Sequence, residues 1–261
     1  MYAVERGSEE MNKEEIIEVQ NLSVHYQGNS ALKNVSFTVS KGTIVGVIGP
    51  NGAGKSTLMK AMLGLEKKTG SVHFFGQQIK NLRKKIAYVP QRNMIDWDFP
   101  VRVEDVVVMG RYMHIPWYKR TGKADKAKAV DALKKVGMED FADRQIGELS
   151  GGQQQRVFIA RALTQDADLF FLDEPFVGID VISEEIIVNL LRELRDEGKT
   201  IFVIHHDLSK VEKYFDQLVL LNQKLIHAGN VKDVFSAANI KRAYQGNTIV
   251  GENKEMVVVS P

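Results

Sequence analysis

Near the beginning of the chain, apolar residues recur in short runs that alternate with polar residues. This alternation is typical of strands with one buried and one solvated face. The turn residues Gly28-Asn29 and Lys41-Gly42 separate the runs. The sequence therefore predicts a small antiparallel sheet ahead of the next apolar run. Its strands are expected at residues 17–19, 22–26 and 35–39.

A second set of apolar runs shows no alternation, and such a run indicates a strand buried on both faces of a parallel sheet. These runs lie at residues 44–48, 168–175 and 200–204. Apolar residues at helical spacing predict helices at residues 57–65, 154–163 and 186–194. Further strands are expected at residues 71–75, 86–89, 218–221 and 224–227, and a short helix at residues 231–235. This order of strands and helices predicts an α/β fold.

Residues 92–155 lack this pattern of strands and helices. They contain a loop with large apolar side chains, at residues 93–100, and two expected helices, at residues 103–112 and 125–136. We interpret this block as a helical subdomain inserted into one domain. The expected organisation is a flexible extension at residues 1–15, a domain at residues 16–245 and a tail at residues 246–261.

Both tryptophans of the chain, Trp97 and Trp117, lie in the inserted block, together with Phe99 and Tyr118. Large aromatic side chains in loops either form a local core or dock a partner, because interfaces are enriched in Trp and Tyr. The sequence leaves both interpretations of these side chains open.

The strongest chemical signal follows the strand at residues 44–48. It consists of Gly49-Pro50-Asn51-Gly52-Ala53-Gly54-Lys55-Ser56-Thr57, which fits the G-x-x-x-x-G-K-[ST] pattern of a P-loop. Glycines let the backbone turn so that successive N–H groups surround a phosphate, and the following helix presents its positive end to the same anion. We expect Lys55 to contact the β- and γ-phosphates and the Ser56 hydroxyl to bind Mg²⁺. The motif therefore predicts ATP and Mg²⁺ as the bound cofactors.

Two acids, Asp173 and Glu174, end the apolar run at residues 168–175. In open α/β sheets, ligands bind at the carboxyl ends of the strands. We expect Asp173 to support Mg²⁺ and Glu174 to polarise an attacking water, because phosphoryl transfer needs a metal and a group that orients the nucleophile. The alternative is a strand that simply leads into an acidic turn.

His205-His206-Asp207 follow the strand at residues 200–204. A donor at this edge would bond a γ-phosphate oxygen and stabilise developing negative charge. A metal site shared by the two histidines is disfavoured, because adjacent strand residues point to opposite faces of a sheet.

Leu149-Ser150-Gly151-Gly152-Gln153 precedes the helix expected at residues 154–163. Ser150 can cap that helix, and Gln153 fits the third helical position of a capping box. The backbone N–H groups and the serine hydroxyl also form a second potential phosphate cradle. Capping explains the serine and the glutamine, but it does not require two glycines.

Two further residues allow two interpretations each. Tyr26 is placed where a ring can stack on adenine, and it also suits a strand as an ordinary sheet aromatic. Gln91 follows the strand at residues 86–89. Its amide oxygen can bind Mg²⁺ or orient water, although a lone glutamine there is usually a turn residue.

The composition narrows the class of protein. With 261 residues, 44% of them hydrophobic, the chain is long enough for a sizeable core, and its net charge of +2 does not suggest a nucleic-acid footprint. There is no cysteine, which excludes disulfides and thiolate metal sites. No apolar run approaches the roughly 18 residues of a membrane span, and the N-terminus lacks the apolar core of a signal peptide. We therefore expect a soluble, cytoplasmic chain that reaches a membrane only through partners.

The P-loop, Gln91, residues 149–153, Asp173-Glu174, Gly178-Ile179-Asp180 and His206 occur in one order. In this order they resemble the nucleotide-binding subunit of ABC transporters, over residues 16–244. The resemblance implies a P-loop hydrolase fold of the ABC-ATPase type. It also implies that Tyr26 stacks on adenine and that Gln91 contacts both Mg²⁺ and the membrane partner.

For the remaining positions the resemblance implies that Glu174 is the catalytic base, that Asp180 takes part in crosstalk between two sites, and that His206 is a switch residue. It further implies a homodimer in which each ATP lies between the P-loop of one subunit and residues 150–153 of the other. A second cradle of this kind would supply donors and exclude solvent from the γ-phosphate. The membrane partners are then permease subunits, and the dimer lies at the cytoplasmic side of the cell membrane.

Three segments indicate a particular subfamily of these transporters. They are residues 90–100, Met109-Gly110-Arg111-Tyr112 and His205-His206-Asp207. They look like the subfamily that imports manganese, zinc or iron with an extracytoplasmic metal-binding lipoprotein, and manganese is the first choice among these. Importers of siderophores or cobalamin are the nearest alternative.

Other ATPases share the signature. Chromosome-maintenance and DNA-repair ATPases place a long coiled coil between P-loop and signature, whereas about ninety residues without sustained heptads intervene here. Stand-alone ATPases of translation usually carry two cassettes, and this chain has one. A GTPase or a kinase is disfavoured because the N-K-x-D, H-R-D and D-F-G motifs are missing.

Overall fold

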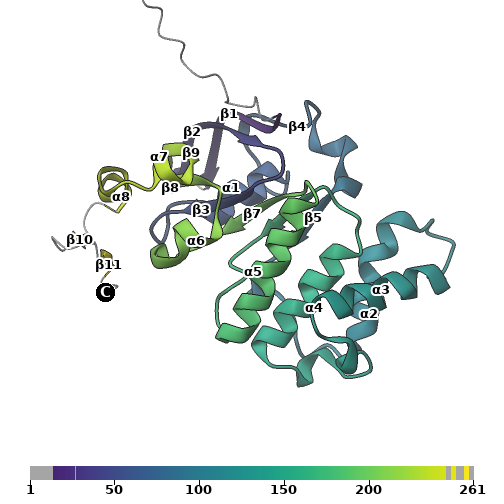
Figure 1. The fold of residues 1–261 in the computed structure, drawn as a ribbon. Helices are drawn as coiled ribbons and strands as arrows, with labels where there is room; N and C mark the ends of the chain where they lie inside the picture. Colours follow the sequence, from purple (N-terminus) through teal and green to yellow (C-terminus); the bar gives the residue numbers. More distant parts are fainter. Residues whose placement is uncertain (1–13, 27, 245–247, 251–255, 259–261) are drawn as a thin grey trace, which may run out of the picture.

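The computed structural model describes residues 14–26 and 28–244 and the backbone of residues 248–250 and 256–258. Two sheets stack at one end of the molecule, and a group of helices extends from the other end (Figure 1). The extension expected at residues 1–15 lies outside the described residues except for its last two. Of the tail, only the antiparallel pair β10 (Thr248–Val250) and β11 (Met256–Val258) is described.

The predicted antiparallel sheet has three strands in the order β2-β1-β4. They are β1 (Glu15–Tyr26), β2 (Asn29–Ser40) and β4 (Thr69–Phe74). The runs at residues 17–19 and 22–26, expected as separate strands, form one strand. They are joined by an irregular register between Val19 and Leu22, where Asn21 adopts a φ of 50°. A bulge of this kind breaks the alternation in the sequence without ending the strand.

The second sheet has six strands in the order β5-β6-β7-β3-β8-β9, all parallel except β9. They are β3 (Ile44–Ile48), β5 (Ile86–Val89), β6 (Leu169–Leu172), β7 (Thr200–Ile204), β8 (Gln217–Asn222) and β9 (Lys224–Asn230). Phe170 and Leu172 face one core of the protein, and Leu169 and Phe171 face the other. The sheet is therefore buried on both faces, as its unbroken apolar runs predict.

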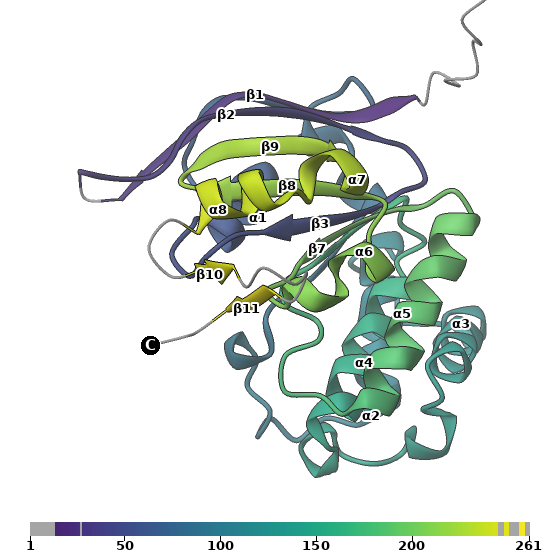
Figure 2. The same ribbon diagram turned by 60° about the vertical axis from the view of Figure 1, so that its left-hand side comes forward.

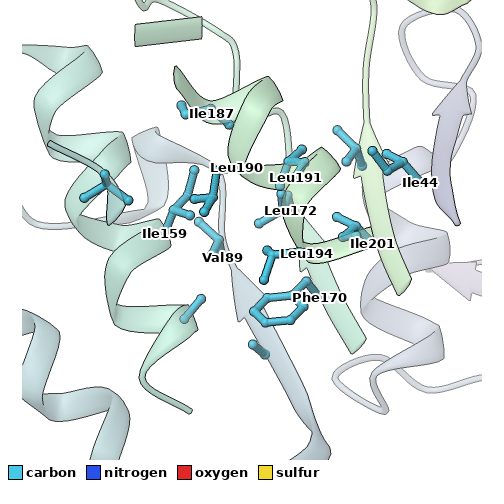
Figure 3. Close-up of a cluster of buried hydrophobic side chains, with 14 of the residues drawn as sticks. Ile44, Val89, Ile159, Phe170, Leu172, Ile187, Leu190, Leu191, Leu194 and Ile201 are labelled. Carbon is cyan, nitrogen blue, oxygen red and sulfur yellow. The ribbon is translucent and has the colours of Figure 1, made fainter. Parts of the chain in front are cut away.

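Helices cover the parallel sheet. On the side of the antiparallel sheet lies α1 (Lys55–Met62), and on the opposite side lies α5 (Val181–Asp196). Figure 3 shows Leu190, Leu191 and Leu194 of α5 against strand residues such as Phe170 and Ile201. Around α8 (Ala237–Ala243) the prediction was incomplete, because this helix was not expected. The other short helices are α6 (Val211–Tyr214) and α7 (Val231–Val234).

Helices α2, α3 and α4 pack against one another, and we call them the helical subdomain (Figure 2). Their bounds are α2 (Val103–Val108), α3 (Lys123–Lys135) and α4 (Gly151–Leu163). The block expected as an inserted subdomain, residues 92–155, contains α2 and α3 but only the beginning of α4, which also packs against β5. The helix expected at residues 103–112 ends at Val108 and continues as a 3-10 helix, Met109–His114. Further 3-10 helices are Ile79–Asn81, Arg83–Lys85, Arg92–Met94, Glu139–Phe141, Ile146–Glu148 and Leu208–Lys210.

Several predicted ends were wrong by a few residues. Strand β6 is shorter than the run expected at residues 168–175. Helices α4 and α5 begin earlier than expected, directly after Ser150 and Asp180. The reason is capping, because both residues accept a hydrogen bond from a backbone N–H of the first helical turn. Within residues 14–244, none of the helices combines the length and the apolar composition that a membrane span requires.

Candidate nucleotide site

The P-loop connects β3 to α1, as its motif predicts. Two of its glycines are required by close packing. A Cβ on Gly49, whose φ is +154°, would lie 2.0 Å from the carbonyl oxygen of Leu221. A Cβ on Gly54, whose φ is +92°, would lie 2.6 Å from the side chain of Leu32. Any other residue at these two positions would displace the loop from the end of the sheet.

Lys55 lies in this loop with its charge turned inward. Its Nζ donates to the carbonyl oxygens of Gly49, at 2.9 Å, and Pro50, at 3.0 Å. Burial lowers the pKa of Lys55, and the nearby carboxylates of Glu174 and Asp173 partly offset that effect. A desolvated ammonium at the positive end of a helix is a strong attractor for a phosphate.

Asp173 follows β6 and is almost fully buried, with 1% of its surface exposed. The Ser56 hydroxyl donates to its Oδ1 at 3.1 Å, so the two oxygens expected around Mg²⁺ are brought together. Burial raises the pKa of Asp173, and the negative charge of Glu174 raises it further. These two acids lack a full counter-charge, which is the environment that a divalent cation relieves.

Gln91 and Glu174 are also brought together. The Gln91 amide Nε2 donates to Glu174 Oε2 at 2.6 Å, which leaves the amide oxygen free for another partner. Glu174 has a φ of 52°, a left-handed conformation that is rare for a glutamate. Such strain is concentrated at functional sites, where it fixes the direction of a side chain.

Tyr88 also lies near this site, although no sequence pattern predicted it. Its hydroxyl is buried and has no hydrogen-bond partner among the described residues. Burial raises the pKa of Tyr88 to about 12, and the charge of Asp173 adds to that effect. A neutral phenol beside this acid is a donor without an acceptor, and no periodicity or motif distinguishes it from an ordinary strand tyrosine.

The segment at residues 150–153 forms the capping box that its sequence predicts. The Ser150 N–H donates to Gln153 Oε1 at 2.9 Å, and the Gln153 N–H donates to Ser150 Oγ at 3.4 Å. The glycines have a separate cause. A Cβ on Gly152 would lie 2.4 Å from Ser183 Oγ and 2.7 Å from Asp180 Oδ2, so the entrances of α4 and α5 pack with no room for a side chain.

Asp180 caps α5 within the same contact. Its Oδ1 accepts from the Ser183 N–H at 2.8 Å and its Oδ2 accepts from the Ser183 hydroxyl at 2.8 Å. These hydrogen bonds lower the pKa of Asp180. The residue expected to take part in crosstalk therefore has a structural role beside residues 150–153.

Arg92, which the sequence interpretation did not single out, joins two parts of the site. Its Nε and Nη2 donate to Gln154 Oε1 at 3.1 and 2.8 Å. Gln91 contacts the catalytic edge of the sheet, and the next residue contacts the helix that follows residues 150–153. The stretch from Gln91 to Arg92 thus links the α/β part to the helical subdomain.

Tyr26 ends β1 with 42% of its surface exposed, so its ring is accessible for stacking. His206 is exposed beyond the end of β7, whereas its neighbour His205 is buried among Phe176, Tyr214 and Phe215, with ring centroids 5.5 to 6.1 Å away. Burial lowers the pKa of His205 to about 4. The two histidines therefore have different environments.

The P-loop and the second expected phosphate cradle, residues 150–153, are not joined by a hydrogen bond. Among the described residues, no hydrogen bond connects residues 150–153 to the P-loop. Ser150 and Gln153 form hydrogen bonds with each other, and Lys55 donates to carbonyl oxygens of its own loop. Residues 150–153 and the P-loop are therefore separate in one chain.

The donor set fits a magnesium nucleotide. Mg²⁺ prefers carboxylate, hydroxyl and amide oxygens and takes only a few from a protein, keeping the rest for phosphates and water. Asp173, Ser56 and Gln91 supply such oxygens. In the part of the chain that the structure describes, no group of three His, Cys, Asp or Glu side chains is placed to hold a metal by itself.

A P-loop at the end of a parallel sheet, with a buried aspartate and a glutamate on the neighbouring strand, defines a P-loop ATPase. The chain belongs to the ABC transporter family, because the profile of that family, described as ABC transporter, matches residues 32–177. This confirms the predicted fold class and the predicted activity, an ATPase that energises a transporter.

Known proteins of this family are similar over nearly the whole chain. The manganese transport system ATP-binding protein MntB of Halalkalibacterium halodurans is 62% identical over 244 residues, which cover 94% of this chain and 98% of that protein. The zinc transport system ATP-binding protein TroB of Treponema pallidum is 51% identical over 231 residues, covering 88% and 87%.

A solved structure shows the same fold. It is described as an inward-facing conformation of a putative metal-chelate type ABC transporter, and it superposes with a TM-score of 0.80 at 27% identity, covering 94% of this chain and 98% of that one. The extent of this match includes both sheets and the helical subdomain.

Proposed function

We propose that the chain is the ATP-hydrolysing subunit of an importer for manganese. The observation that carries the proposal is the 62% identity, over 94% of this chain, to the ATP-binding protein of a manganese transport system. Zinc is the second candidate, because a zinc transport protein is 51% identical. Importers of siderophores or cobalamin remain the more distant alternative.

Around ATP, each predicted residue has a role that its position supports. The N–H groups of residues 49–57, except Pro50, surround the phosphates, Lys55 exchanges its two carbonyl contacts for phosphate oxygens, and Tyr26 stacks on adenine. Ser56, Gln91 and Asp173 would hold Mg²⁺, and the metal would supply positive charge to neutralise the phosphates.

Glu174 acts as the base that orients and polarises the attacking water. Its hydrogen bond to Gln91 and its strained backbone fix the carboxylate at the edge of the sheet before nucleotide arrives. His206, exposed at the end of the adjacent strand β7, donates to the γ-phosphate. Positioning of this kind is the main contribution a protein makes to phosphoryl transfer.

Two chains form a head-to-tail dimer in which residues 150–153 of one cover the P-loop of the other. Two features support this arrangement: residues 150–153 and the P-loop are separate within one chain, and apolar side chains are exposed beside Asp180. Val181 and Ile182 have 78% and 72% of their surfaces exposed at the start of α5. Residues of this kind are suited to burial between two subunits.

The permease docks on an apolar groove of the helical subdomain. The groove has a volume of about 270 Å³ and is lined by Ile95, Trp97, Phe99, Val101, Met109 and Phe158, among others. Phe99 is 59% exposed, whereas Trp97 packs edge-on against Phe158 with ring centroids 5.1 Å apart. Trp97 is thus the wall of the groove, and Phe99 is the side chain left for a partner. The proposal places the dimer at the cytoplasmic side of the membrane, where it receives cargo indirectly from a metal-binding lipoprotein.

The decisive experiment replaces the carboxylate of Glu174 with an uncharged amide of nearly the same shape. Glu174→Gln should retain ATP binding, lower turnover by about a hundredfold or more, and trap an ATP-dependent dimer in light scattering. Glu185→Gln, on the exposed face of α5, is the matched control and should behave as the parent chain. If the Glu174→Gln chain stays monomeric at saturating ATP, the proposed dimer is wrong.

The cargo is tested separately. Cells that lack this chain should accumulate less manganese and recover when the parent chain, but not Glu174→Gln, is supplied. Recovery of zinc with unchanged manganese would assign the zinc alternative instead.

A further inference from the structure

One end of the helical subdomain exposes large aromatic side chains that the nucleotide site does not use. We call residues 112–120 the aromatic tip. The exposed fractions are 95% for Trp117, 68% for Tyr118, 57% for Tyr112 and 39% for Met113. Such a concentration of exposed apolar surface is unusual in a soluble protein and indicates an interaction site.

The aromatic tip rests on a rigid base. A Cβ on Gly110 would lie 2.2 Å from a carbonyl oxygen of α4, so the chain is in tight contact there. Arg111 forms an ion pair of 2.7 Å with Asp166, and His114 Nε2 lies 2.8 Å from the carbonyl oxygen of Gln165. These contacts fix the beginning of the aromatic tip against α4 and the turn that follows it, so binding there would need little further ordering of the backbone.

The charge of this region has one sign. Residues 109–124 contain no aspartate or glutamate. Lys119, Arg120 and Lys123 are exposed, and no acid of the described residues lies within ion-pair distance of them. By contrast, the neighbouring Lys128 is neutralised by Asp166. The aromatic tip thus lies beside three exposed basic side chains that have no ion-pair partner among the described residues.

We propose that the aromatic tip binds the surface of an anionic phospholipid bilayer. Trp and Tyr prefer the headgroup level of a membrane, and exposed Lys and Arg are attracted to anionic headgroups. A hollow of about 430 Å³ between Tyr112, Trp117 and Arg120 provides room for a phosphate headgroup beside the rings. An acidic protein surface would satisfy the charges, but it would not require rings that stand this far out of the fold.

The position of the aromatic tip agrees with this partner. Met109 lines the apolar groove and Tyr112 lines the hollow, and both belong to one 3-10 helix, Met109–His114. Side chains three residues apart lie on the same face of a 3-10 helix. The aromatic tip and the groove therefore face the same side; the conclusion that this side faces the membrane rests on the proposed function.

The chain contains its own reporter for this contact. In Trp97→Phe, Trp117 is the single remaining tryptophan, because the sequence has two. The purified full chain is mixed with vesicles of phosphatidylcholine alone, or with phosphatidylglycerol added, and Trp117 emission and co-sedimentation are measured. With the anionic vesicles we expect a blue shift of Trp117, quenching by brominated lipid, and weakening of binding by salt.

Two pairs of charge reversals separate a specific surface from general basicity. Lys119→Glu with Arg120→Glu should weaken vesicle binding by roughly tenfold or more. Arg83→Glu with Lys84→Glu changes the net charge equally at an exposed 3-10 helix elsewhere and should leave binding unchanged. Both variants should hydrolyse ATP in solution at the parent rate.

Three results would overturn the proposal: no response of Trp117 to anionic vesicles at low salt, equal weakening by both pairs, or binding only when permease is present in neutral vesicles. The last result would assign the aromatic tip to a protein interface. None of them affects the proposed ATPase, whose test is the dimer trapped by Glu174→Gln.

Discussion

The carboxyl edge of the parallel sheet, where the P-loop, Asp173 and Glu174 lie, differs from the helical subdomain in which side chains are buried and which are exposed. We call this carboxyl edge the catalytic edge. At the edge, polar and charged groups are buried or half-buried and hydrogen-bonded: Lys55 with its own loop, Asp173 with Ser56, and Glu174 with Gln91. In the helical subdomain, large apolar side chains such as Phe99 and Trp117 are exposed. The first region is prepared for a small charged ligand, and the second is prepared for large partners.

On the proposed function, this contrast separates the chemistry of ATP hydrolysis from the contacts with membrane partners. Buried charges are costly unless they are compensated, so the edge must hold its geometry before and after nucleotide binds. Exposed aromatic side chains tolerate the loss and recovery of a partner. Changes at the edge should therefore affect nucleotide affinity, and changes in the subdomain should affect coupling.

The largest expected effect is at Gly49. Gly49→Ala brings a Cβ to within 2.0 Å of the Leu221 carbonyl and forces the P-loop away from the sheet. We expect ATP affinity, measured by calorimetric titration, to fall about a hundredfold or more, since overpacking against backbone costs several kcal/mol. Gly110→Ala creates a comparable clash in the helical subdomain, 2.2 Å from the Arg161 carbonyl, and should lower stability with little change in ATP affinity. A similar loss of affinity in both variants would remove the contrast between the two regions.

The next effect is a dependence of stability on pH through His205. Its pKa is about 4 in the folded protein and 6.5 as an ordinary value, so the unfolded chain binds the proton first as the pH falls. The contribution of neutral His205 is complete above pH 6.5 and is lost progressively toward pH 4, by up to about 3 kcal/mol.

Denaturant unfolding across this range checks the prediction for His205. His205→Phe should flatten the decline in the free energy of unfolding, whereas the exposed His227→Gln should not. If the parent chain and His205→Phe lose stability in parallel, the buried imidazole is not the cause.

A smaller effect is expected in the apolar groove. Phe99→Ala should preserve soluble ATPase activity and stability while reducing transport by roughly tenfold, because the side chain lost is one of the few that anchor an interface. Trp97→Ala should also leave ATPase activity intact and uncouple transport, with a further loss of stability because it packs on Phe158. Transport measured in reconstituted vesicles distinguishes them; equal loss of ATPase activity and transport would assign these side chains to the core.

The smallest effect concerns the link between the regions. Arg92→Ala, Gln154→Ala and the double variant form a cycle whose coupling free energy should be about 1 kcal/mol in denaturant unfolding. Additive effects would mean that the Arg92–Gln154 hydrogen bonds do not join the two parts energetically.

The sheets and the P-loop were predictable because their signals are local. An unbroken apolar run such as residues 200–204 is buried on both faces in any α/β protein, and a glycine pattern after a strand constrains its own loop. The capping box at Ser150 and Gln153 was predicted for the same reason.

The remaining features depend on contacts between distant residues. Gly152 must be a glycine because Asp180 and Ser183, at the entrance of α5, pack against it, and these residues are far from it in the sequence. Tyr88 is distinguished only by the acid beside it, and α8 is held by two buried side chains, Ile240 and Ala243, too few for a periodic signal. The Arg92–Gln154 contact likewise has no sequence pattern.

Trp97 connects the groove to the catalytic glutamate by a short route. Its Nε1 donates to the carbonyl of Arg92 at 2.9 Å, and the preceding residue, Gln91, holds Glu174. On the proposed function, a displacement of the indole must either break that bond or move the peptide that precedes the contact to Glu174. The occupancy of the groove would in this way alter the rate of ATP hydrolysis through a single peptide unit.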